Sequence, residues 1–120
     1  MKMKKTILGF ALLTALSSAV LGDETIEVYK SPDCGCCGKW GEIMKKNGFE
    51  IVEHKTNAII ETKNKYGVPP ELSSCHTGIV GGYAIEGHVP AEEIKALLAA
   101  KPADVVGISV PGMPLGSPGM

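Results

Sequence analysis

A strand, a cysteine loop and a helix follow one another early in the chain, and this succession narrows the possible folds. Ile26–Tyr29 has the alternation of a short, half-buried strand. Trp40, Ile43 and Met44 recur at helical spacing until Gly48 supplies a stop signal. The pattern predicts a strand that passes through a cysteine loop into a helix, with the tryptophan and the methionine in the core.

Strand and helix patterns continue to about residue 101. A second strand and helix follow the first pair, which predicts two parallel strands joined by a right-handed crossover. Gly81-Gly82 then predicts a tight hairpin, because glycine tolerates positive φ. The resulting order is βαβαββα. The later elements are expected as strands at Phe49–Val52, Thr77–Val80 and Tyr83–Val89, a helix ending at Tyr66 and a helix from Pro90 to Lys101.

The first 22 residues have the pattern of a secretory signal peptide. Lysines at positions 2, 4 and 5 precede an uncharged apolar run over residues 7–20. This run is shorter than the roughly 20 residues that span a bilayer, which favours cleavage over a membrane anchor. We therefore expect export to the periplasm and three regions: a signal peptide at 1–22, a folded domain at 23–101 and a Pro/Gly/Met-rich tail at 102–120.

Charge argues against some partners of the exported chain. Removal of residues 1–22 takes away three lysines and no acid, which leaves nine lysines against 13 acidic residues, a net charge of −4. Binding to nucleic acid or to an anionic membrane surface is not expected for such a chain. The sequence after residue 22 also predicts no stable membrane insertion.

Cys34-Gly35-Cys36-Cys37 places three thiols within four residues at the expected start of a helix. Helix N-terminal amides favour the thiolate form, which both nucleophilic attack and ligation of soft metals require. The motif therefore predicts metal binding or redox chemistry. A structural disulfide is the plainer alternative for an exported protein, and four cysteines allow three pairings.

The element order and the cysteine position resemble the thioredoxin-like fold in its small glutaredoxin-type form. The resemblance spans about Thr25 to Lys101 and maps a Cys-x-x-Cys motif onto Cys34 and Cys37. It implies an α/β fold in which a four-stranded mixed sheet carries helices on both faces, followed by an irregular C-terminal tail.

Three departures from thioredoxin-like oxidoreductases favour a metal site. Cys75-His76 stands where the fold family has a cis-proline, Cys36 adds a third thiol inside the motif, and His88 ends the fourth strand. In the expected topology these residues converge at one end of the sheet. His54, at the end of the second strand, is expected to be solvated.

Methionines in the tail extend the candidate ligand set. Thioether sulfur needs no deprotonation and suits Cu(I), whereas zinc sites seldom use it. A flexible arm without a core of its own can close over the thiolates, although the same methionines are also typical of a disordered tail. The predicted metal ligands are Cys34, Cys36, Cys37, Cys75, His76, His88, Met113 and Met120.

Longer motifs indicate similarity to a particular family and not only to a fold. They are Tyr29 to Trp40 around the cysteines, Gly67 to Thr77, Ile85 to Pro90, and the Met-Pro-Leu-Gly-Ser-Pro-Gly-Met end. They resemble a family of small exported bacterial proteins that was long filed as a domain of unknown function and is often labelled metal-binding or copper-binding. The resemblance implies copper or silver handling in the periplasm.

Three functions remain open at the level of the sequence. We expect a copper-binding protein, not an enzyme, that holds Cu(I) or Ag(I) through cysteine thiolates for sequestration or for delivery to a periplasmic copper oxidase or efflux component. The alternatives are a thiol-disulfide oxidoreductase that uses Cys34 and Cys37, and a structural zinc site of the Cys3His type.

Overall fold

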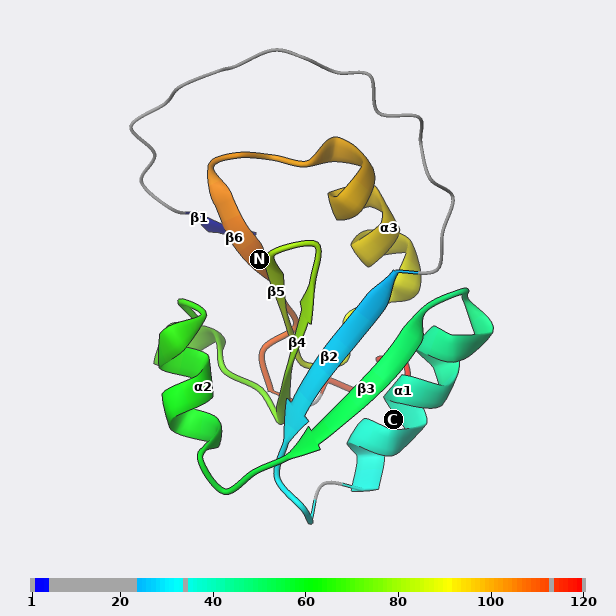
Figure 1. Ribbon diagram of the computed structural model, residues 1–120, viewed down its shortest axis with the longest axis vertical. Helices are drawn as coiled ribbons and strands as arrows, with labels where there is room; N and C mark the ends of the chain where they lie inside the picture. The colour runs from blue at the N-terminus through cyan, green and yellow to red at the C-terminus, as the bar shows by residue number, and fades with distance from the viewer. Residues whose placement is uncertain (1, 5–23, 34, 113, 120) are drawn as a thin grey trace.

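The computed structural model describes residues 2–4, 24–33, 35–112 and 114–119, without the side chains of Lys4 and Cys36. These residues form a mixed α/β fold with three α-helices around one sheet (Figure 1). In this part of the chain no helix is both long and apolar enough to span a membrane. The elements are β1 (Lys2–Lys4), β2 (Thr25–Lys30), α1 (Gly35–Lys46), β3 (Glu50–Lys55), α2 (Ile59–Lys65), the 3-10 helix η1 (Pro70–Leu72), β4 (His76–Val80), β5 (Tyr83–Glu86), α3 (Ala91–Ala100) and β6 (Val105–Ser109).

Within the described residues, the sheet contains the four predicted strands and two further strands. Its strands lie in the order β1-β6-β5-β4-β2-β3. β2 and β3 pair in parallel, as their strand–helix–strand connection requires. β4 pairs antiparallel with both β2 and β5, and the predicted hairpin turn falls at Gly81 and Gly82, both with positive φ. The predicted βαβαββα succession is thus confirmed from β2 to α3.

The prediction of four strands and an irregular tail was wrong. The described residues form a six-stranded sheet, because β6 lies inside the predicted tail and β1 inside the predicted signal peptide. β6 pairs in parallel with β5 after the α3 crossover, and β1 pairs antiparallel with β6. The proline, glycine and methionine content of the tail as a whole obscured a short β-branched run, whose burial alternates as in a strand.

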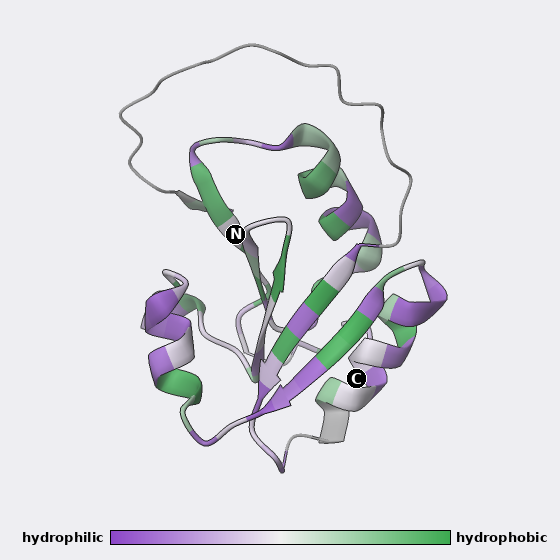
Figure 2. Ribbon diagram, in the orientation of Figure 1, coloured by the Kyte–Doolittle hydropathy of each residue, from purple (hydrophilic) through white to green (hydrophobic). Residues whose placement is uncertain are grey.

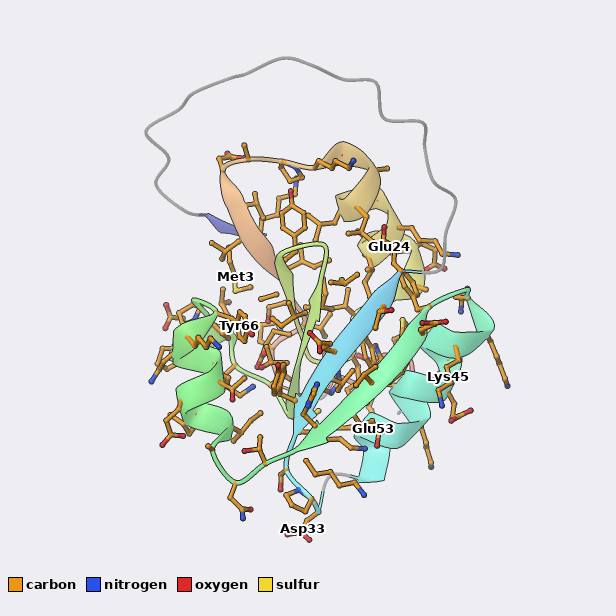
Figure 3. The ribbon with its side chains drawn as sticks, viewed as in Figure 1. Met3, Glu24, Asp33, Lys45, Glu53 and Tyr66 are labelled. Carbon is orange, nitrogen blue, oxygen red and sulfur yellow. The ribbon has the colours of Figure 1, made fainter. Side chains whose placement is uncertain are left out.

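Helices cover the two faces of the sheet unequally, with α1 and α3 on one side and α2 on the other (Figure 1). β2 alternates between apolar and polar residues along its length (Figure 2), and Ile26 and Val28 are buried in the larger core cluster. The predicted core residues Trp40 and Met44 are fully buried there. A smaller cluster, with Met3 in it and Tyr66 packed against it, fills the α2 side (Figure 3).

Strand register brings three loops to one end of the sheet. Lys30, the last residue of β2, pairs with His76, the first residue of β4. Thr77 in turn pairs with Glu86, the last residue of β5. The cysteine loop after β2, the Cys75 segment before β4 and the His88 segment after β5 therefore meet, as the sequence predicted.

Candidate metal centre

Four potential metal ligands meet at this end of the sheet. One ligand atom from each of Cys37, Cys75, His76 and His88 lies within 4.8 Å of the others. Ligand atoms around one tetrahedral ion with bonds of about 2.0–2.3 Å stand about 3.3–3.8 Å apart. A contraction of about 1 Å would therefore suffice to close these four side chains on a single ion.

Different elements carry the four side chains, so only the folded chain assembles them. Cys37 lies in the first turn of α1, and Cys75 directly precedes β4. His76 opens β4 and His88 follows β5. Both imidazoles are buried, with exposed fractions of 0% and 1%. Burial on this scale removes water as a partner for the ring nitrogens.

Each of the two histidines has one nitrogen that lacks a partner among the described residues. His76 Nε2 and His88 Nε2 are buried without a hydrogen bond. A buried polar atom left in this state costs about 1–3 kcal/mol. Two such atoms beside two cysteines fit a metal site, because a bound ion would satisfy both nitrogens.

The C-terminal segment fixes the tautomer of His88. Its Nδ1 lies 2.6 Å from the carbonyl oxygen of Pro118. A carbonyl only accepts, so Nδ1 carries the proton and a neutral His88 keeps its lone pair on Nε2. Gly119 continues this contact, since a Cβ there would lie 2.7 Å from Trp40 N and 3.3 Å from His88 Nδ1. The backbone of the tail thus supports a ligand from behind.

His76 is held neutral by its surroundings. Burial, together with the neighbouring His88 and the ammonium groups of Lys63 and Lys30, lowers its pKa to about 3, against a backbone hydrogen bond at Gly87 that raises it. The Trp40 ring packs against it with the centroids 4.5 Å apart. Its Nδ1 lies 3.4 Å from Cys75 Sγ. With Cys75 as a thiolate, Nδ1 donates to the sulfur and Nε2 keeps its lone pair.

The other predicted ligands lie outside what the structure describes. Cys34, Met113 and Met120 are outside the described residues, and of Cys36 only the backbone is described. Their ligand roles remain predictions. Cys37 is disulfide-bonded in this structure, so it must be reduced before its sulfur can bind a metal ion as thiolate. His54 lies on the edge strand β3, where its ring stacks on Tyr29 at 4.6 Å.

Sequence reasoning missed the groups that surround these side chains. The Pro118 carbonyl has no sequence signature as a histidine partner. Lys30, Lys63 and Glu86 are buried charges, with exposed fractions of 6%, 5% and 0%. The sequence does not predict the burial of Glu86, because a glutamate at the end of an apolar strand is commonly exposed to solvent.

Fold and site together define a small mixed α/β protein with a cluster of thiol and imidazole groups, in which Cys37, His76 and His88 are buried and Cys75 is partly exposed. A family model described as "Protein of unknown function, DUF411" matches residues 72–120. A search of curated proteins finds no match.

Two solved structures resemble the chain closely. One, "Copper resistance protein copG- Form 2", is 44% identical, with a TM-score of 0.77, and the match covers 82% of this chain and 77% of that one. The other, "Copper resistance protein copG- Form 1", is 45% identical, with a TM-score of 0.75, and the match covers 80% and 75%. The chain belongs to the family of these copper resistance proteins, which confirms the resemblance seen in the sequence. The thioredoxin-like assignment stays a prediction.

Proposed function

We propose that this chain is an exported copper-binding protein that takes up Cu(I), or Ag(I), as its cargo. The observation that carries the proposal is the meeting of Cys37, Cys75, His76 and His88 within 4.8 Å. The names of the two solved relatives point to copper as the metal. Thiolate and imidazole are suitable ligands for a soft monovalent ion.

Each buried imidazole can offer a ring nitrogen with a free lone pair to a metal ion. Because the pKa of His76 is lowered to about 3, no proton has to leave its ring when a metal ion binds near neutral pH. His88 presents Nε2 because the Pro118 carbonyl holds the proton on Nδ1. Proton release on binding should therefore come from the thiols.

Zinc is the competing metal, since two cysteines and two histidines form a common structural zinc set. The surplus of sulfur favours Cu(I). Cys34, Cys36, Met113 and Met120 would raise the number of sulfur ligands beyond what one tetrahedral zinc ion accepts, whereas Cu(I) shares thiolates readily in small clusters. Side chains of adjacent helix residues point in different directions, and we therefore expect the Cys36-Cys37 pair to favour low-coordinate ions or a cluster over a single ion held by all three loop thiols.

Residues 1–22 supply the export signal in this proposal, and the mature protein works in the periplasm. Copper tolerance would follow either from sequestration of Cu(I) or from delivery to a periplasmic copper oxidase or efflux component. In both roles the thiols must stay reduced in an oxidising compartment, and a bound ion protects them.

The test is anaerobic titration of the reduced protein with Cu(I). We expect a thiolate-to-Cu(I) absorption band in the ultraviolet and its loss or strong reduction in Cys34→Ser/Cys37→Ser. Met44→Leu is the matched control, since it removes a fully buried core sulfur and should leave the band unchanged. Absence of the band in the unsubstituted protein, or unchanged binding in the double variant, would remove the proposal. Elemental analysis of protein from copper-exposed cells separates copper from zinc.

A thiol-disulfide oxidoreductase is the second candidate, favoured by the disulfide of Cys37 in the first turn of α1. Cys34 would be the nucleophile and Cys37 the resolving thiol. Insulin reduction that survives strict removal of metal would support this candidate over copper binding.

A further inference from the structure

A buried carboxylate, that of Glu86, lies behind the candidate metal centre, on the α2 side of the sheet. Glu86 is fully buried at the end of β5, and its charge is paired with Lys63 of α2, which is also buried. Successive side chains of a strand point to opposite faces of the sheet. Glu86 and its pairing partner Thr77 therefore face α2, whereas His76 faces Trp40 of α1.

The two oxygens of this carboxylate hold the two residues on either side of Cys75-His76. Oε2 accepts a hydrogen bond from the backbone N–H of Ser74 at 2.7 Å, and Oε1 accepts one from the Thr77 hydroxyl at 2.5 Å. Lys63 donates to Oε2 and, at 3.2 Å, to the Thr77 hydroxyl oxygen. One side chain thus spans the ligand pair from its far side.

Backbone hydrogen bonds also connect the strand of Glu86 to the neighbouring segments. The Gly87 N–H donates to the carbonyl of His76 at 3.0 Å, and the Val110 N–H donates to the carbonyl of Glu86 at 3.0 Å. The Ser74 hydroxyl donates to the Gly112 carbonyl at 2.6 Å. Glu86 therefore stands where the Cys75-His76 segment, the His88 segment and the start of the tail are joined.

Stability alone explains this ion pair poorly. Replacement of a buried ion pair by apolar side chains of similar volume is often neutral or stabilising, because the charges no longer have to be stripped of water. A buried pair that carries this cost and that binds both flanks of two ligands points to a role in their geometry. Groups that orient metal ligands from behind commonly change metal affinity by about 10–100-fold when they are removed.

We infer that Glu86, neutralised by Lys63, is a positioning residue that sets the geometry of Cys75 and His76 for the metal ion. The inference rests on the proposed metal-binding function and adds to it a part that the cysteine and histidine motifs do not contain. In this inference the Lys63–Glu86 pair influences the metal affinity and the spectrum of the bound metal.

The experiment compares two double variants of the full chain that both remove the ion pair. Lys63→Met/Glu86→Gln keeps an amide oxygen that can still accept from Ser74 N–H, whereas Lys63→Met/Glu86→Leu has no acceptor. Lys45→Met/Glu42→Gln is the control, because it removes an exposed ion pair of α1, whose lysine lies on the outer side of the molecule (Figure 3). Circular dichroism establishes that each variant is folded before Cu(I) affinity and the ultraviolet band are measured.

We expect the leucine variant to bind Cu(I) about 10–100-fold more weakly, with an altered thiolate band, and the glutamine variant to recover most of the loss. If the leucine variant does not fold, Thr77→Val keeps the ion pair and removes the Oε1 contact, and should weaken binding several-fold. Wild-type affinity and spectrum in a folded leucine or valine variant would overturn the inference.

Hydrogen exchange in metal-free protein separates this inference from the proposed function. Exchange of the amides of residues 74–77 should be faster in the leucine variant than in the glutamine variant, whether or not the protein binds copper. If the unsubstituted protein shows no Cu(I) band, the proposed function fails. If it binds and the exchange rates of the two variants are equal, the positioning role of Glu86 fails.

Discussion

Gly119→Ala tests the role that the structure gives to the C-terminal segment. Gly119 has φ +84, and a Cβ on it would lie 2.7 Å from Trp40 N, 3.0 Å from Trp40 Cα and 3.3 Å from His88 Nδ1. The neighbours at the two shorter distances are backbone atoms of a helix and cannot move aside. Because Gly119 directly follows Pro118, whose carbonyl accepts from His88, we expect this clash to displace the segment and the His88–Pro118 hydrogen bond to be lost.

The loss of that bond sets the size of the effect. A hydrogen bond of this kind contributes about 0.5–1.5 kcal/mol, and 1.4 kcal/mol corresponds to a factor of ten in affinity. Cu(I) affinity should therefore fall about two- to twelve-fold. The free energy of unfolding should change little, since none of the described residues 114–119 belongs to either core cluster.

Gly116→Ala provides a matched control. Gly116 has φ +89, so alanine meets the same backbone strain, but a Cβ there has no neighbour within 4 Å. Both variants are titrated with Cu(I) in competition with a chelator of known affinity, and their unfolding is measured in urea. Equal Cu(I) affinities in the two variants would refute the reasoning, because strain alone would then account for the result.

Two further predictions concern stability. The pKa of His76 is about 3 in the folded protein against an ordinary value of 6.5, so the unfolded chain binds the extra proton first as pH falls. The contribution of neutral His76 to stability is complete above pH 6.5 and is lost between pH 6.5 and 3 at up to about 1.4 kcal/mol per pH unit. In urea unfolding of metal-free protein, the free energy of unfolding should therefore depend less on pH in His76→Gln than in the unsubstituted protein. Parallel pH profiles of the two proteins would count against the burial argument. Gly107→Ala should lower the free energy of unfolding by more than about 3 kcal/mol or detach β6, because its Cβ would lie 1.8 Å from the Ala84 carbonyl oxygen. Gly41→Ala in α1, where the nearest neighbour of a Cβ lies at 3.7 Å, should be neutral or slightly stabilising when both variants are compared by urea unfolding.

Much of the fold could be read from local patterns. The strand before the cysteine loop, the helix that carries Trp40 and Met44, and the Gly81-Gly82 hairpin follow from periodicity and turn chemistry, which act within a few residues. β6 was missed because five residues of strand were surrounded by a composition typical of disorder. Its partner, β5, lies about 20 residues earlier, and no local signal records a pairing over that distance.

The candidate site divides in the same way. The sequence by itself determined which soft ligands the chain offers, because side-chain chemistry is local: thiols at the start of α1, a thiol directly before β4 and an imidazole at the first residue of β4. The expected topology also placed these ligands at one end of the sheet, but only the tertiary structure decided that ligand atoms of Cys37, Cys75, His76 and His88 lie within 4.8 Å of one another. It also showed the contacts around them, the Pro118 carbonyl on His88 and the Glu86 carboxylate on Ser74 and Thr77. Those contacts depend on strand register and on the path of the tail, which burial and hydrogen bonding across the whole molecule fix together.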